Sequence, residues 1–277
     1  MSTFYNSERL KYNQMNYNND VELDNFCSQC LLVINAVGPS FKINDKIALH
    51  ALRNNCHYID IGGYGILRDL LKPYEKSIEA QKLCFIIGVG WMPGISGVFS
   101  KTIIETHLNS PENTNFNIYY GAVDNWSYSS TYDLAASSMG KTRSYVYSHG
   151  KEIQVSPFRY THHKFFPFIG HKKICMPSFD EQLTQLATSL KQIRKISTFI
   201  MLNDYISMGK FMFIKIFYKH NLNKATLMLQ DDYQRLVKKE NKWGSVICQV
   251  SKIEPERKID TFYYLYTKNN LLYTALP

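Results

Sequence analysis

The sequence predicts an α/β protein in which a small parallel sheet is followed by an α+β domain with a mostly antiparallel sheet. Between residues 20 and 110, short apolar runs alternate with helical patterns, the order typical of parallel βαβ units. From residue 111 to residue 277, most segments have the apolar pattern of strands, with an amphipathic helix among them. Residues 1–19 are rich in Asn and Tyr, and we expect a loose N-terminal segment there.

Three short apolar segments are the predicted parallel strands, and each leads into glycine. They are LLVINAV at 31–37, HYIDIGG at 57–63 and CFIIGVG at 84–90. Because the first is almost continuously apolar, we expect it to be buried on both faces. Parallel strands end at one common edge, which is where open α/β sheets bind their ligands.

Helical patterns lie before, between and after these strands. They cover residues 20–30 with Asp20 as N-cap, 44–55 capped by Asn44 or Asp45, 66–83 interrupted at Pro73, and 94–108.

The second half contains five strand-like segments and a capped helix. The segments are residues 114–125, 144–155, 195–204, 242–254 and 260–270. The His149-Gly150 pair suits the turn of a hairpin within the second of them. Ser178 and Glu181 form a capping box that predicts a helix over 178–193.

Composition and charge limit the classes of function. The 32 Lys and Arg residues exceed the 23 Asp and Glu residues, giving a net charge of +9 that favours anionic partners such as phosphates, carboxylates or nucleic acid. These residues are scattered, so we do not expect a nucleic-acid partner. The apolar segment 199–219 carries Asp204, Lys210 and Lys215, which argues against a membrane span. No secretory leader is visible, so we expect a cytoplasmic protein with reduced cysteines, in which the Cys27/Cys30 spacing is incidental and no metal is bound.

Three motifs in the first half, taken together, resemble the saccharopine dehydrogenase-like family of NAD(P)-dependent reductases. They are INAVGP at 34–39, CHYIDIGG at 56–63 and IIGVGWMPGISG at 86–97, and the resemblance covers about residues 20 to 110. It implies a Rossmann-like dinucleotide-binding domain over residues 20–110, and the strand pattern of residues 111–277 is interpreted as an α+β substrate or dimerisation domain. It also implies that seven residues lie beside NAD(P): Asn35, Gly38, Pro39, Asp60, Gly90, Pro93 and Gly94.

Each of these residues also has a purely structural interpretation. Glycine and proline make turns at the ends of strands in any protein. Asp60 is the candidate for a catalytic role in the cleft, and capping the helix near Ile66 is its alternative role.

The sequence departs from the family at its beginning. The family starts with a strand, a G-x-G-x-x-G turn and a helix whose N-terminus holds the diphosphate, yet no glycine precedes Gly38 here. The segment from Asp260 to Pro277 resembles the family's last strand without the closing helix. We therefore expect a truncated Rossmann-like sheet and a possible homodimer or partner chain that supplies the missing strands.

Two further groups of residues are candidates for binding. Lys141 and Arg143 could hold a substrate carboxylate, with plain surface charge as the alternative. His162, His163 and His171 lie in an aromatic, basic stretch that could grip an acidic substrate or RNA, although a partly exposed loop packed by phenylalanines is the favoured interpretation.

The leading functional hypothesis is an oxidoreductase that transfers hydride between NAD(P) and an amino-acid-derived imine or a related small molecule. The alternative is a non-catalytic remnant or interaction subunit, such as a split-gene fragment, that needs a partner chain to bind dinucleotide.

Overall fold

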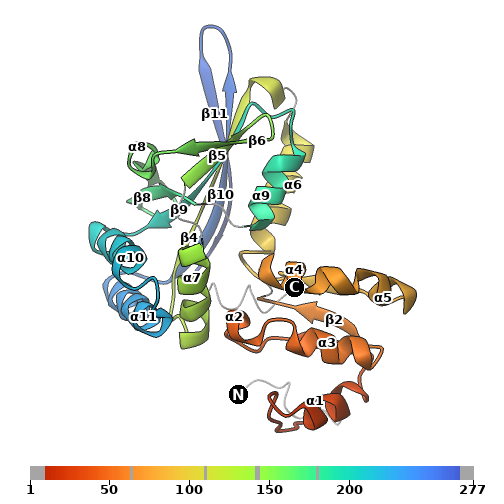
Figure 1. The fold of residues 1–277 in the computed structure, drawn as a ribbon. Helices are drawn as coiled ribbons and strands as arrows, with labels where there is room; N and C mark the ends of the chain where they lie inside the picture. The colour runs from red at the N-terminus through yellow and green to blue at the C-terminus, as the bar shows by residue number, and fades with distance from the viewer. Residues whose placement is uncertain (1–9, 63–64, 109–110, 141–143, 179–180, 269–277) are drawn as a thin grey trace.

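Two β-sheets organise the chain in the computed structural model, which describes residues 10–62, 65–108, 111–140, 144–178 and 181–268 (Figure 1). The smaller sheet has three parallel strands in the order β1-β2-β3, and the larger one has eight strands. All but one of the strand pairings in the larger sheet are antiparallel, the exception being β4 with β9. The predicted fold class, a small parallel sheet followed by a mostly antiparallel one, is confirmed.

The N-terminal unit alternates strands and helices as the sequence pattern predicts. Its elements are α1 (Asp20–Cys27), β1 (Leu32–Asn35), α2 (Ser40–Ile43), α3 (Lys46–Arg53), β2 (His57–Asp60), α4 (Gly65–Leu71), the 3-10 turn η2 (Lys72–Tyr74), α5 (Glu75–Ala80) and β3 (Phe85–Ile87). Pro73 lies in η2 and separates α4 from α5, as expected. The predicted cap of α1 is wrong by one residue, because the side chain of Asn19 accepts the N–H groups of Val21 and Glu22.

The smaller sheet is covered by helices on one face only. Val33 and Tyr58 face α1, α3 and α4 and are buried, whereas Ile34 and Ile86 on the opposite face are 61% and 47% exposed. The expectation that β1 is buried on both faces is therefore wrong. In a sheet with sequential strand order, right-handed crossovers place every connecting helix on the same side.

The C-terminal unit is built on the larger sheet. Its strands are β4 (Thr114–Val123), β5 (Ser144–Ser148), β6 (Lys151–Val155), β7 (His162–Phe166), β8 (His171–Pro177), β9 (Lys195–Leu202), β10 (Trp243–Ile253) and β11 (Lys258–Thr267). The main path runs β11-β10-β4-β9-β5-β6, and β8 joins β7 to β9. His149 and Gly150 have φ values of 49° and 73° between β5 and β6, so the predicted hairpin turn is confirmed.

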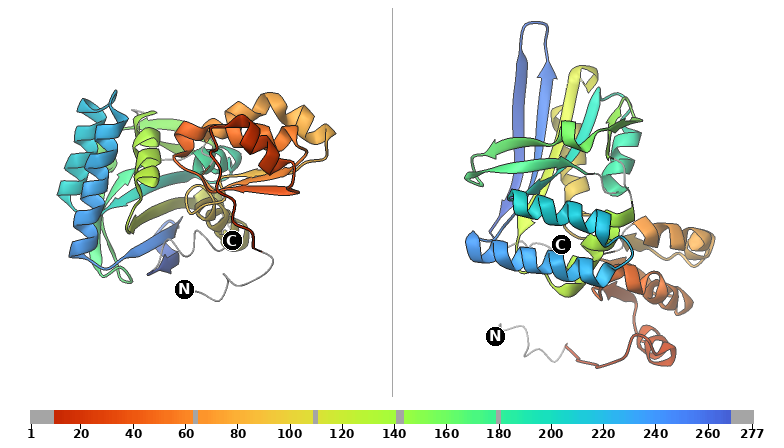
Figure 2. Two further views of the ribbon diagram at one scale, coloured as in Figure 1. Left: turned by 90° about the horizontal axis from the view of Figure 1, so that it is seen from below. Right: turned by 60° about the vertical axis from the view of Figure 1, so that its left-hand side comes forward.

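Helices cover one face of the larger sheet. They are α6 (Ile95–His107), α7 (Tyr128–Gly140), α9 (Glu181–Ser189), α10 (Tyr205–Phe217) and α11 (Leu222–Lys239), with the short η3 (Pro111–Asn113) and α8 (Pro157–Tyr160) in connections. Figure 2 shows α10 and α11 running side by side. Arg235 of α11 donates two hydrogen bonds, of 2.7 and 3.0 Å, to the carboxylate of Asp204, which also caps α10. The pair therefore fixes one helix against the other.

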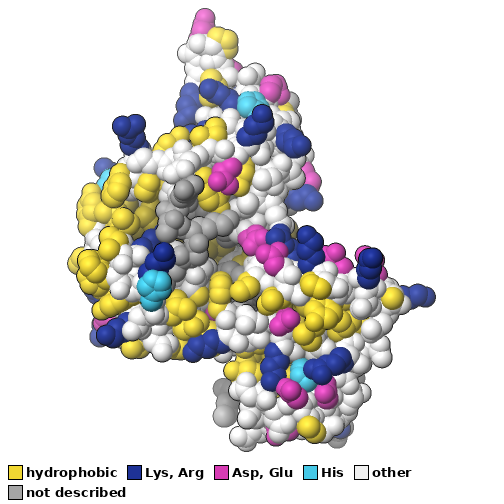
Figure 3. All heavy atoms as spheres, viewed as in Figure 1, with side chains coloured by type: hydrophobic (Ala, Val, Ile, Leu, Met, Phe, Trp, Pro, Cys, Tyr) yellow, Lys and Arg dark blue, Asp and Glu magenta, His cyan; other side chains and the backbone are white. Residues whose placement is uncertain are grey.

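Apolar side chains also reach the surface on this unit. In Figure 3 they gather over α10, whose Ile216 and Phe217 are 65% and 66% exposed. None of the helices in the described part of the chain has the length and apolar character needed to cross a bilayer.

Candidate functional site

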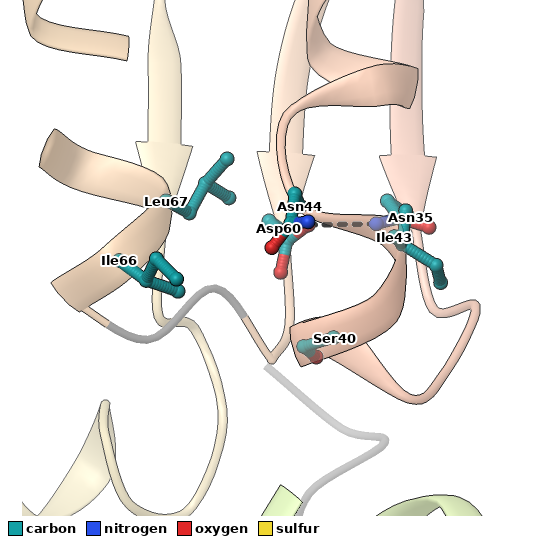
Figure 4. Close-up of a pocket in the computed structure, with 7 residues that line it drawn as sticks. All are labelled: Asn35, Ser40, Ile43, Asn44, Asp60, Ile66 and Leu67. Carbon is teal, nitrogen blue, oxygen red and sulfur yellow. Dashed lines mark hydrogen bonds between the residues drawn. The ribbon is translucent and has the colours of Figure 1, made fainter. Parts of the chain in front are cut away.

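The ends of the three parallel strands meet at one edge, as the sequence predicts. Asn35 and Asp60 are register partners at the ends of β1 and β2, and Asn35 Nδ2 donates a 2.7 Å hydrogen bond to Asp60 Oδ2 (Figure 4). The N–H of Val89, directly before Gly90, donates to the Asp60 carbonyl at 3.0 Å. The structure therefore brings Asn35, Asp60 and Gly90 together.

Asp60 is held inside the smaller unit. It is 3% exposed, and the Tyr58 hydroxyl donates a 2.6 Å hydrogen bond to its Oδ2. Burial and the neighbouring carboxylate raise the pKa of Tyr58, so this hydroxyl stays protonated and donates. Asp60 and Asn35 line a hole of about 10 Å³, and neither lines the large cavity described below. A catalytic role for Asp60 remains a prediction, and its contacts bind β1 to β2.

The Gly38-Pro39 turn connects the smaller unit to helix α7. A Cβ at Gly38 would lie 2.9 Å from the Ser129 Cβ, so the close approach of the two segments requires glycine. Just after the turn, the backbone N–H groups of Ser40 and Phe41 donate to the carboxylate of Asp133 at 2.9 and 3.1 Å. Asp133 lies on α7 and is 7% exposed, so one buried carboxylate from the larger unit holds the start of α2.

The turn from Gly90 to Gly94 forms the second connection. Gly94 has a φ of +130°, and a Cβ there would lie 2.0 Å from the Gly90 carbonyl oxygen, so only glycine fits. Gln182 of α9 accepts the Gly94 N–H at 2.9 Å and donates to the Gly94 carbonyl at 3.3 Å. Its amide therefore occupies the N-terminus of α6. Pro93, between the two glycines, lines the large cavity with Gly90.

A cavity of about 680 Å³ lies where the two units meet. Its walls come from the turns of the smaller unit, the carboxyl ends of β4 and β9, and helices α7, α10 and α11. Trp91 and Trp126 both line it, and the Trp126 ring stacks on Tyr233 with centroids 4.6 Å apart. Aromatic walls with a few polar groups are typical of a small-molecule site.

The charged residues in this lining are mostly acidic. Among the described residues the carboxylates are Asp124, Asp133, Glu181 and Asp232, and the cation is Lys215. A cavity of this volume is in the range of small-molecule sites.

The residues present do not fit the diphosphate of a dinucleotide. Backbone N–H groups at helix N-termini normally hold it, but Asp133 already accepts those of Ser40 and Phe41, and Gln182 accepts that of Gly94.

Some candidate residues lie elsewhere. Lys141 and Arg143 fall outside the described residues, so their predicted role is untested. The histidine stretch forms the β7–β8 hairpin, with His162 and His163 in β7 and His171 in β8, so the expectation of a loop is wrong. Strand pairing with β9 through β8 explains the difference.

Sequence reasoning missed Asp133, Gln182 and Lys215 at this junction. Asp133 and Gln182 contact segments about 90 residues away along the chain, and no local pattern marks such contacts. Lys215 follows Ser207 and Phe211 at helical spacing, which is a signal the sequence contains, but only the fold shows that this stripe faces a cavity.

No protein-family model matches the chain, and no curated protein matches it. Solved structures that are similar over most of its length include the following two. An engineered D-amino acid dehydrogenase bound to NADP+ has 8% identity and a TM-score of 0.42, over 96% of this chain and 75% of that one. A dehydrogenase (MviM) from Clostridium difficile has 7% identity and a TM-score of 0.34, over 86% of this chain and 65% of that one. Similarities at this level do not establish a family or an activity.

Proposed function

We propose that the chain is an NAD(P)-dependent oxidoreductase of the saccharopine dehydrogenase-like kind, acting on an amino-acid-derived imine or a related small molecule. The observation that carries this proposal is the position of the 680 Å³ cavity, at the carboxyl-end loops of three parallel strands. Open α/β sheets bind ligands at that edge.

The walls of the cavity support a binding role. Gly90 and Pro93, two residues implied by the family resemblance, line it together with Trp91. The stacked aromatic side chains of Trp126 and Tyr233, on the larger unit, also line it and would exclude water from a planar ligand. In this proposal the cavity holds the small-molecule substrate, and the diphosphate of the cofactor is held by groups outside the described fold.

A second candidate is a non-catalytic subunit that binds dinucleotide only with a partner chain. The misfit of the diphosphate favours it, and so does the uncovered face of the smaller sheet. β1 is an edge strand of that sheet, and its Leu32 and Ile34 are 41% and 61% exposed. Such an edge is suited to pairing with another strand.

Titration of the purified chain with NADH and NADPH distinguishes the two candidates. Trp91 and Trp126 line the cavity, so their fluorescence should be quenched as the nicotinamide ring enters. A Kd tighter than about 1 mM, worth roughly 4 kcal/mol, supports the oxidoreductase. Absence of saturable quenching by either nucleotide contradicts it and favours the partner-dependent subunit.

A pair of variants assigns any binding to the cavity. Ala136→Trp adds a large side chain to the cavity wall on α7, and it should weaken the quenching at least tenfold. Thr102→Trp adds the same side chain to an exposed position on α6 and should leave the affinity unchanged. Equal affinity in the two variants would place the dinucleotide elsewhere.

A further inference from the structure

The negative charges of the carboxylates that line the cavity are balanced by other groups of the chain. Three form ion pairs with a cation: Asp124 with Lys242 at 3.3 Å, Glu181 with Arg68, and Asp232 with Arg235 at 2.9 Å. The fourth, Asp133, accepts the backbone N–H groups of Ser40 and Phe41. A charge that is buried or half-buried is stable when an opposite charge or hydrogen bonds balance it. The charges of these four residues are therefore balanced without a ligand, although Asp124 Oδ2 has no hydrogen-bond partner within the described residues.

Lys215 is different. Within the described parts of the chain, no carboxylate lies within ion-pair distance of its ammonium group, and Nζ lies 5.3 Å from the centroid of the Phe211 ring. The side chain is half-buried, and this burial lowers the pKa of Lys215. An ammonium group held partly away from water without a counter-charge favours an anion beside it.

Lys215 lies on the wall of the cavity, so an anion that balances its charge would bind there. Ser207, Phe211 and Lys215 all line it, and they follow one another at intervals of four residues along α10. Residues at this spacing share one face of a helix. Among the described residues that line the cavity, Lys215 is the one with a cationic side chain, so an anionic group of a ligand would pair with it.

We infer that Lys215 is the anion-binding residue of the cavity and holds an oxyanion of the ligand, a carboxylate or a phosphate. This inference deepens the proposed function and rests on its assignment of the cavity as the ligand site. A carboxylate would come from an amino-acid-derived substrate, and a phosphate would come from a phosphorylated small-molecule substrate. The neighbouring aromatic rings strengthen the attraction by lowering the local dielectric constant.

The test observes the Lys215 amine directly, without any dinucleotide. Lysines are dimethylated with ¹³C-formaldehyde, and the NMR signal of Lys215 is identified by its absence in Lys215→Met. The full chain is then titrated with glutarate, with inorganic phosphate and with uncharged glutaramide at constant ionic strength. Lys219 is exposed just beyond the end of α10, and its signal, identified with Lys219→Met, is the internal control.

Saturable movement of the Lys215 signal, with a rise in its apparent pKa and no such change at Lys219, supports the inference. A response to glutarate identifies the ligand group as a carboxylate, and a response to phosphate identifies it as a phosphate. The inference is overturned if Lys215 responds to neither anion more than Lys219 does, or if glutaramide produces the same response.

Two further variants give an independent measure. Tryptophan fluorescence should report at least tenfold weaker binding of the responding anion in Lys215→Met, and near wild-type binding in Lys215→Arg, which keeps the charge. Equal binding by Lys215→Met and the wild type overturns the inference. Because NADH and NADPH are absent from these assays, failure of the dinucleotide titration leaves their outcome unaffected.

Discussion

Replacing Asp133 by Asn should loosen the junction between the two units. The carboxylate accepts the N–H groups of Ser40 and Phe41 through its two separate oxygens, at 2.9 and 3.1 Å. The amide of Asn offers one oxygen, so it can accept one N–H while its NH₂ group opposes the other. One charge-assisted hydrogen bond, worth about 1.5–3 kcal/mol, is lost and one N–H is left without a partner.

The net cost should be smaller than that sum. Burial raises the pKa of Asp133 by more than the two N–H groups lower it, so the ionised side chain is itself costly to bury, and its removal recovers part of the loss. We expect local opening at α2 to become easier by about 2 kcal/mol, which corresponds to roughly 30-fold faster amide exchange.

Hydrogen–deuterium exchange at the Ser40 and Phe41 amides measures this change. Asp45→Asn is the matched control, because Asp45 stands before α3 and makes no side-chain capping hydrogen bond. Its exchange rates at the same two amides should equal those of the wild type. Exchange in Asp133→Asn within about threefold of the wild type, less than 1 kcal/mol, would refute the reasoning.

Three other predictions concern the remaining charged and thiol groups. Burial raises the pKa of Asp204, but hydrogen bonds from Arg235 and from the start of α10 lower it by more, so the pKa in the folded state lies below that in the unfolded state. The stabilisation from Asp204 is therefore present above about pH 4 and is lost as the pH falls. In urea unfolding, Asp204→Asn should lower the free energy of unfolding by about 2–3 kcal/mol at pH 7, and its stability should depend less on pH in the acid range. Burial raises the pKa of the Cys175 thiol to about 12, whereas Cys84 is exposed. A disulfide reagent should therefore label Cys84 in the native protein and Cys175 only after unfolding, and labelling of Cys175 in the native protein would contradict the fold. Tyr58→Phe removes a hydrogen bond to a buried carboxylate and should lower the free energy of unfolding by about 1.5–3 kcal/mol, whereas an unchanged melting temperature would show that the bond is dispensable.

The sequence was most informative where structure is local. The strands and helices of the first half, the break at Pro73 and the His149-Gly150 turn all follow from short-range rules of periodicity and turn chemistry. The cap of α1 was misplaced because Asn19 and Asp20 are both good caps, and only the backbone decides between them.

Contacts between distant segments could not be predicted in this way. The apolar run 31–37 reads equally well as a strand covered on one face or on two, since the covering elements lie elsewhere in the chain. The same limit applies to the site. The sequence places Asn35 and Asp60 together because they end neighbouring strands, but the hydrogen bonds that Asp133 and Gln182 accept depend on how a second unit packs against the first.

The occupancy of the N–H groups at the two turns has a thermodynamic consequence. Asp133 and Gln182 accept hydrogen bonds from backbone N–H groups that could also donate to an anionic ligand, and one N–H group cannot donate a full hydrogen bond to both acceptors. Any ligand that claims these donors must therefore compete with the larger unit for them. Because coupling between two binding equilibria is reciprocal, the ligand would lower the affinity of the two units for each other by a certain factor, and contact between the units would lower the affinity for the ligand by the same factor.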